Sequence, residues 1–158
     1  LDKKADIFIS VHANAALKHR VKKAKGIETF FLSPARSSRA KRVAASENRS
    51  DMRKMSYSSK NSLLTILNQS KITQSNKLAI DVQQNILNSA RSKYSGVVDG
   101  GVREGPFWVL VGAQMPSILV ELGYISHPVE SKRLYSTSYQ KLLADGIANG
   151  VDSYFSKN

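Results

Sequence analysis

Short apolar runs that end at a polar or charged residue mark the strands of this chain. Residues 5–11 are mostly β-branched or aromatic and run into His12, and residues 117–120 run into Glu121 in the same way. Strands without alternating polar residues are typical of a sheet that is covered on both faces. The same pattern predicts two more strands, at residues 26–32 and 107–111.

Amphipathic spacing predicts helices between and after these strands. Apolar or small residues recur at helical spacing in residues 35–48, 75–93 and 139–155. The glycine-rich residues 97–105 are typical of a turn. Strands that alternate with helices predict an α/β fold, here a three-layer α/β/α sandwich with a mainly parallel central sheet. Ligands of such sheets gather at the carboxyl ends of strands, which is where the two polar strand ends lie.

Length and composition favour a single globular domain. The chain has 158 residues, of which 41% are hydrophobic and 23% are charged, and one domain commonly has about 100–200 residues. No apolar run approaches the ~20 residues of a membrane-spanning helix, so stable membrane insertion is not expected. The absence of cysteine excludes disulfides and thiolate metal ligands. Because the chain begins with Leu1 rather than Met, we expect it to be part of a longer polypeptide.

Basic charge is concentrated in the first part of the chain. Residues 1–60 hold 15 Lys and Arg against 5 Asp and Glu, residues 61–158 hold 9 against 7, and the formal net charge is +12. Such an imbalance indicates either a solvated basic face or a surface for a polyanion. Nucleic acid, anionic lipid and an acidic wall polymer are all candidate partners on charge alone.

Three residues near the predicted strand ends are candidates for chemistry. His12 is either a partly buried structural histidine or a ligand, and Asn14, two positions later, either orients a ligand or caps a turn. Glu121 follows an interior strand, and a buried carboxylate needs a partner. It either forms a structural salt bridge or acts as a general base whose pKa a dry cleft raises toward neutrality. The three histidines form no compact ligand motif, so local spacing alone predicts no metal site.

Two longer segments resemble a known enzyme family. Residues 5–14 (ADIFISVHAN) resemble the HAN signature of the type 3 zinc-dependent N-acetylmuramoyl-L-alanine amidases, which are bacterial cell-wall hydrolases. Residues 116–126 (PSILVELGYIS) are similar to the LVE segment of the same family. Residues 26–31 and 105–110 also match in the expected order between them, so the resemblance covers most of the chain.

The resemblance implies a zinc site held by two histidines and one glutamate, with a second glutamate as catalyst. On this sequence the HAN histidine is His12, a zinc ligand, and the LVE glutamate is Glu121, the catalytic carboxylate. The other two ligands belong before Leu1, so residues 1–158 correspond to an amidase catalytic domain that lacks its N-terminal strand and helix. A catalytic zinc site needs three protein ligands and an open position, so this chain alone is expected to hold an incomplete site.

Residues 35–55 resemble the helix that related division amidases place over the zinc, and residues 36–60 are a candidate regulatory helix or loop insertion. The stretch contains the sequence ENRSD, which begins at Glu47. The resemblance implies that Glu47 occupies the open zinc position until an activator protein moves the helix. The alternative is an ordinary surface helix with Asp51 as a capping residue.

The reaction implied by the resemblance is zinc-assisted hydrolysis of the amide between N-acetylmuramic acid and the L-alanine of the stem peptide, with Asn14 binding substrate. Peptidoglycan is then the partner, in wall remodelling and daughter-cell separation, and the location is periplasmic or extracellular. The alternative is a catalytically inactive basic module of the same fold that binds the wall. Nucleic acid is not expected, because no nucleic-acid motif accompanies the charge and Glu121 would be unexplained.

Overall fold

The computed structural model describes residues 4–33, 37–49 and 69–158, and its centre is a four-stranded sheet with the strand order β1-β4-β2-β3. The strands are β1 (Phe8–Asn14), β2 (Ile27–Leu32), β3 (Asp99–Gly105) and β4 (Ser117–Tyr124). β1 pairs with β4 and β2 with β3 in parallel, whereas β2 and β4 are antiparallel. The predicted α/β fold is confirmed, with a mixed sheet in which two of the three pairings are parallel.

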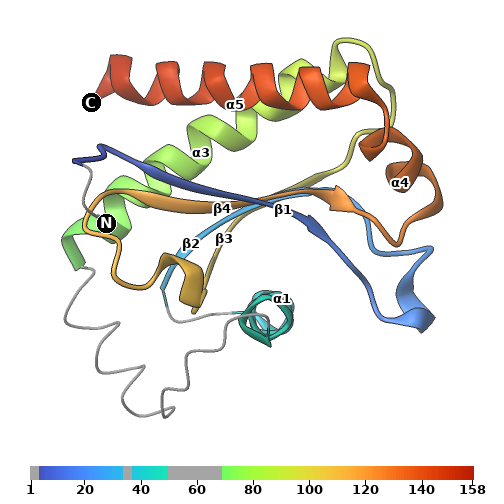
Figure 1. The fold of residues 1–158 in the computed structure, drawn as a ribbon, viewed down its shortest axis with the longest axis horizontal. Coiled ribbons are helices and arrows are strands. Elements are labelled where there is room, and N and C mark those ends of the chain that lie inside the picture. The colour runs from blue at the N-terminus through green and yellow to red at the C-terminus, as the bar shows by residue number, and fades with distance from the viewer. Residues whose placement is uncertain (1–3, 34–36, 50–68) are drawn as a thin grey trace.

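Helices cover both faces of this sheet (Figure 1). α3 (Gln69–Arg91) and α5 (Thr137–Lys157) lie on one face, and α1 (Ser38–Arg49) crosses the other, where Figure 1 shows it nearly end-on. The short helix α4 (Pro128–Leu134) follows β4. This arrangement is the predicted three-layer sandwich. In the described part of the chain, no helix combines the length and apolar character needed to cross a membrane.

The larger core lies between the sheet and the α3–α5 layer. Leu78, Val82 and Ile86 of α3 are fully buried at the spacing of four that the sequence shows. α5 approaches α3 closely because Gly150 has no side chain: a Cβ at this position would lie 2.5 Å from the Cα of Val82. Gly146 makes the same kind of close approach to Ile86, at 2.6 Å.

A second core lies between the sheet and α1. Small side chains of the helix are buried against aromatic and aliphatic residues of the strands and of the segment after β3. The buried members are Ala40, Val43, Ala44, Phe30, Leu32, Phe107, Leu110 and Leu119. Because α1 is packed in this way, it is a full layer of the fold and brings its polar side chains close to the sheet.

Two glycine-bounded segments differ from their predictions. Residues 97–105, predicted as a turn, contain β3, because Gly100 lets the strand lie against β2 where any side chain would collide with Glu28. Residues 107–111, predicted as a strand, form the 3-10 helix η2 (Trp108–Leu110) instead. Phe107, which directly precedes η2, packs against Phe30, and the centroids of the two rings are 4.8 Å apart.

β1 is less covered than its apolar sequence predicts. Val11 is 50% exposed, because β1 is the edge strand among the described strands and has a neighbour only on the β4 side. Of the predicted regulatory insertion at residues 36–60, α1 accounts for Ser38–Arg49. Residues 50–60, with the predicted cap Asp51, lie outside the described residues.

Candidate metal centre

Three polar side chains form a row across the middle of the sheet. Glu121 on β4 is paired in register with His12 on β1 and with Glu28 on β2. Residues paired in this way point to the same face of a sheet. That face is the one covered by α1, since His12 and Glu28 both contact α1 side chains. Because β2 runs antiparallel to β4, Glu28 lies opposite Glu121 although it is near the start of its own strand.

His12 is held through both of its ring nitrogens. Nδ1 lies 2.7 Å from Oε2 of Glu47 on α1, and Nε2 lies 2.9 Å from the hydroxyl of Ser10. A neutral imidazole that donates from Nδ1 to the carboxylate accepts from Ser10 through Nε2. Metal-bound histidines use one nitrogen for the ion and fix the other with a hydrogen bond of this kind. The contacts of His12 therefore suit a metal ligand whose ring is oriented in advance.

Glu121 is fully buried and lacks a compensating charge. Its exposed fraction is 0%, and neither carboxylate oxygen meets a hydrogen-bond partner in good geometry among the described residues. Burial, reinforced by the carboxylates of Glu47 and Glu28, raises the pKa of Glu121 to about 9. The alternative of a structural salt bridge therefore has no support in this part of the chain. The raised pKa keeps the Glu121 carboxyl group protonated near neutral pH in the metal-free protein.

α1 brings Glu47 to the same row. Arg39 and Glu47 both reach the sheet from this helix, which runs across the strands (Figure 1). Their separation of eight positions corresponds to a rise of about 12 Å along the helix, and two strand spacings measure about 10 Å. The helix thus places Arg39 over Glu28 and Glu47 over His12. One ligand atom from each of His12, Glu47 and Glu121 lies within 4.8 Å of the other two.

The chemistry of this cluster fits a metal ion. Imidazole nitrogen and carboxylate oxygen are ligands that zinc takes. The oxygens of Glu121, which have no hydrogen-bond partner among residues 4–33, 37–49 and 69–158, leave lone pairs for a cation or a water bound to it. Two ligands of one tetrahedral zinc, each about 2.1 Å from the ion, are about 3.4 Å apart. Joint binding by His12 and Glu47 would therefore lengthen their present contact by about 0.7 Å.

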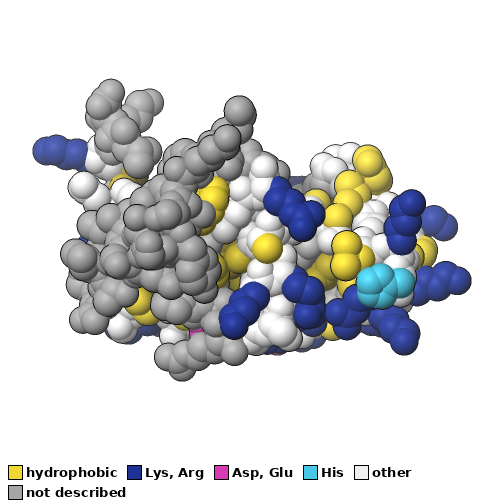
Figure 2. Space-filling model, turned by 90° about the horizontal axis from the view of Figure 1, so that it is seen from below, with side chains coloured by type: hydrophobic (Ala, Val, Ile, Leu, Met, Phe, Trp, Pro, Cys, Tyr) yellow, Lys and Arg dark blue, Asp and Glu magenta, His cyan; other side chains and the backbone are white. Residues whose placement is uncertain are grey.

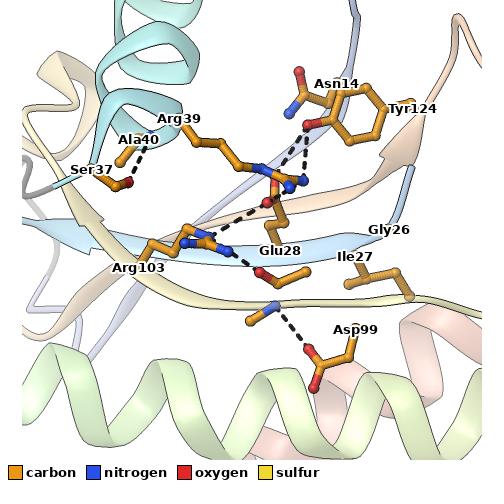
Figure 3. Close-up of polar contacts among 12 residues, drawn as sticks. Asn14, Gly26, Ile27, Glu28, Ser37, Arg39, Ala40, Asp99, Arg103 and Tyr124 are labelled. Atoms are coloured by element: carbon orange, nitrogen blue, oxygen red, sulfur yellow. Dashed lines mark hydrogen bonds and ion pairs between the residues drawn. The ribbon is translucent and has the colours of Figure 1, made fainter. Parts of the chain in front are cut away.

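Glu28, unlike Glu121, is surrounded by cations (Figure 3). Its Oε1 lies 2.6 Å from Arg39 of α1 and 3.7 Å from Arg103 of β3, and its Oε2 accepts a hydrogen bond from the hydroxyl of Tyr124 at 3.3 Å. Burial raises the pKa of Glu28, and the two guanidinium groups oppose that shift. These contacts tie α1 to the sheet by charge as well as by apolar packing.

Asn14 lies at the end of β1, paired in register with Tyr124. Its exposed fraction is 3%, and its Oδ1 accepts a hydrogen bond from the backbone N–H of Ala15 at 2.8 Å. Its Nδ2 has no hydrogen-bond partner among the described residues. Asn14 therefore binds the backbone just after β1 with its side-chain oxygen and keeps a buried donor in its side-chain nitrogen.

Comparison with known proteins decides the family. The sequence model of the N-acetylmuramoyl-L-alanine amidase family matches residues 2–153 of this chain. The chain belongs to the N-acetylmuramoyl-L-alanine amidase family. Two bacterial amidases show the extent of the similarity. AmiA of Salmonella typhimurium is 31% identical over 155 residues, and AmiC of Neisseria meningitidis is 32% identical over 159 residues.

Solved amidase structures share the fold. The N-acetylmuramoyl-L-alanine amidase of Clostridium difficile 630 is 28% identical, with a TM-score of 0.63 over 96% of this chain and 59% of that chain. AmiC2 of Nostoc punctiforme is 26% identical, with a TM-score of 0.62 over the same shares. The alignments with AmiA and AmiC cover 96% of this chain but 52% and 36% of those amidases. The chain thus spans about half the length of these relatives or less.

Within this amidase fold, the sequence identified one part of the polar face and missed another. His12, Glu47 and Glu121, each singled out from the sequence, lie in one cluster. Asn14 lies beside Tyr124 at the strand end. The sequence analysis missed the ion-paired Glu28 and its partners Arg39 and Arg103, although Glu28 interrupts an apolar strand just as Glu121 does.

Proposed function

We propose that the chain is part of a zinc-dependent peptidoglycan hydrolase that cleaves the amide between N-acetylmuramic acid and the L-alanine of the stem peptide. The observation that carries this proposal is the register pairing of His12 with Glu121. It sets a buried carboxylate, which has no hydrogen-bond partner in the described part of the chain, beside an oriented imidazole. Membership of the amidase family supports the reaction and the substrate. Such an enzyme acts in the cell envelope, in the periplasm or outside the cell, in wall remodelling and daughter-cell separation.

In this proposal His12 binds zinc through Nδ1, and the hydroxyl of Ser10 fixes the ring from the other side. When bound, zinc lowers the pKa of a coordinated water and polarises the scissile carbonyl. Glu121 takes a proton from the attacking water as general base and returns it to the departing amine of L-alanine. Its burial, which raises its pKa, suits a carboxyl group that must hold a proton between these two steps.

Asn14 serves as the substrate-binding residue in this proposal. Its Nδ2 is a buried donor without a partner among the described residues, and an unpaired buried donor costs about 1–3 kcal/mol. A carbonyl oxygen of the substrate would supply the missing acceptor.

A tightly held zinc ion needs three protein ligands, and His12 is one of them. We assign the other ligands to a further segment of the same protein, as in a catalytic domain whose N-terminal strand and helix are not among residues 1–158. Glu47 takes the remaining position and blocks it until an activator protein moves α1. The 2.7 Å contact between Glu47 and His12 supports this role.

Substitutions in the complete polypeptide test the proposal. Glu121→Gln should abolish the release of stem peptides from purified peptidoglycan while zinc content stays at the wild-type level, and His12→Ala should lower both. His19→Ala, which changes an exposed histidine, is the matched control and should alter neither. Continued peptide release by Glu121→Gln would overturn the assignment. A wild-type protein that binds the wall but releases no peptide would instead be the inactive wall-binding module.

A further inference from the structure

The connection between β1 and β2 carries a cluster of cations without compensating acids. Residues 15–26 contain no Asp or Glu, and the side chains of the five Lys and Arg residues are all exposed. We call this cluster the basic loop: Lys18, Arg20, Lys22, Lys23 and Lys25. Within the described ranges, none of the five forms an ion pair. Seen from the α1 side, Lys and Arg side chains gather toward one end of the molecule (Figure 2).

The basic loop is fixed to the fold at both ends. The backbone N–H of Ala16 donates to Oγ of Ser126 at 2.9 Å, and that of Gly26 donates to Oε1 of Glu130 at 2.7 Å. The other oxygen of Glu130 accepts from the backbone N–H of Tyr124 at 2.7 Å. The acid that holds the loop is therefore engaged by backbone amides and pairs with none of its cations. A 3-10 turn, η1 (Lys18–Arg20), shapes the chain between these anchors.

Chain connectivity keeps the basic loop near the row of polar side chains that contains His12 and Glu28. Lys18 follows His12 by six residues, and Lys25 precedes Glu28 by three. Even a fully extended chain would keep these pairs of Cα atoms within about 22 Å and about 11 Å of each other. A long polyanion bound at the basic loop would therefore pass close to the catalytic face.

We propose that the basic loop binds an anionic polymer of the cell wall and so holds the enzyme on its insoluble substrate. This inference rests on the proposed function. Four of the five cations are lysines, whose compact charges on flexible stems suit repeating anionic groups without a fixed geometry. Residues 15–26 contain no Phe, Tyr or Trp, the large aromatic side chains on which nucleic-acid bases commonly stack. A polyanion with regularly repeated charges is thus the partner whose chemistry this surface complements.

The test compares two variants that lose the same charge. In the loop variant, Lys18, Lys22, Lys23 and Lys25 are replaced by Gln. In the control variant, four exposed lysines outside the loop are replaced by Gln: Lys77, Lys93, Lys132 and Lys141. Both carry Glu121→Gln in the complete polypeptide, so that the wall is not digested. Binding to purified sacculi is measured by co-sedimentation over a salt series, and thermal unfolding confirms that both variants are folded.

The loop variant should bind sacculi about tenfold more weakly at low salt than the Glu121→Gln parent, with a shallower salt dependence, because fewer counterions are released. The control variant should stay within about twofold of the parent. Sacculi stripped of anionic polymers should bind the parent as weakly as intact sacculi bind the loop variant.

An unchanged loop variant, or an equal loss in both variants, would overturn the proposal. Tighter binding of the parent to anionic vesicles or duplex DNA than to intact sacculi would overturn the wall polymer as partner. Binding to sacculi is measured in proteins that all carry Glu121→Gln. The result of the binding test is therefore independent of the peptide-release assay. A failure of that assay counts against the proposed function alone.

Discussion

Glu28 and Glu121 lie opposite each other on the antiparallel strands β2 and β4, and within the described residues only Glu28 of the two has cations beside it. Both side chains have an exposed fraction of 0%. The paired carboxylate ties α1 to the sheet through Arg39. In the proposed function the other carboxylate exchanges a proton with the attacking water, so the same face of the sheet would combine a structural and a chemical role.

Glu121→Gln should change how the stability of the metal-free protein depends on pH. The pKa of Glu121 is near 4.5 in the unfolded chain and is raised to about 9 in the folded one. Between these values the folded state holds one more proton, so the free energy of unfolding falls as pH rises, by up to about 1.4 kcal/mol per pH unit. Glu121→Gln removes this part of the slope and should be about 4 kcal/mol more stable than wild type near pH 8, but similar near pH 5.

Urea unfolding across this pH range, with a chelator present, measures the effect. Asp152→Asn, which neutralises an exposed carboxylate of α5, is the control and should keep the wild-type slope. A Glu121→Gln protein with an unchanged slope would show that the carboxyl group is not desolvated as described.

Glu47→Ala should raise the basal amidase activity of the complete polypeptide. A hydrogen bond to a charged group is worth about 1.5–3 kcal/mol, and loss of about 1.4 kcal/mol from the blocked state corresponds to a tenfold change. We therefore expect about a tenfold higher rate of peptide release without activator. Ser46→Ala, at the exposed neighbouring position, is the control. An unchanged rate with normal zinc content would contradict autoinhibition.

The point substitution is a sharper test than deletion of residues 36–60. α1 supplies buried side chains to the second core. Asn48 also links the helix to the chain after β3, donating to the carbonyl of Pro106 at 2.9 Å and accepting from the backbone N–H of Trp108 at 2.9 Å. Deletion would expose the strand residues beneath the helix, so lost activity would not distinguish unfolding from a regulatory role.

Arg39→Ala should destabilise the fold by about 1–3 kcal/mol, because it removes the nearest cation from the buried carboxylate of Glu28. The estimate lies below that for a fully buried pair because the Arg39 side chain is 37% exposed. Adding Glu28→Gln should recover part of the loss, since the uncompensated charge is then gone. Urea unfolding of the two single variants and the double variant measures this coupling. Arg42→Ala, on the exposed side of the same helix, should change stability by less than about 0.5 kcal/mol.

Gly150→Ala should destabilise the protein although alanine is the better helix former. Helix propensity alone favours alanine by about 1 kcal/mol, but its Cβ would lie 2.5 Å from the Cα of Val82. Separating α5 from α3 should cost about 1–3 kcal/mol net, seen as a lower melting temperature. Asn149→Ala, at an exposed position of α5, should be neutral or slightly stabilising. A Gly150→Ala protein with a raised melting temperature would refute the close helix contact.

Local pattern predicted the elements that bury continuous apolar surface. β2, β4, α3 and α5 lie where the apolar runs and the helical spacing place them, because their side chains must leave water whatever the topology. Local pattern failed at β3 and η2. Gly100 allows β3 to lie close to β2, and Phe107 is buried in the second core under α1. Both roles depend on contacts with residues that are distant in sequence.

The sequence by itself determined the α/β class, the basic loop and the candidate residues His12, Glu47 and Glu121, because residue type and spacing record burial, charge and donor chemistry. Tertiary structure alone decided the register that aligns His12 with Glu121, and the crossing of α1 that brings Glu47 to them. It also decided that Glu28 is the buried carboxylate with arginine side chains beside it. Each of these depends on strand order and helix orientation. Both follow from packing over the whole domain, so the sequence of any one segment does not predict them.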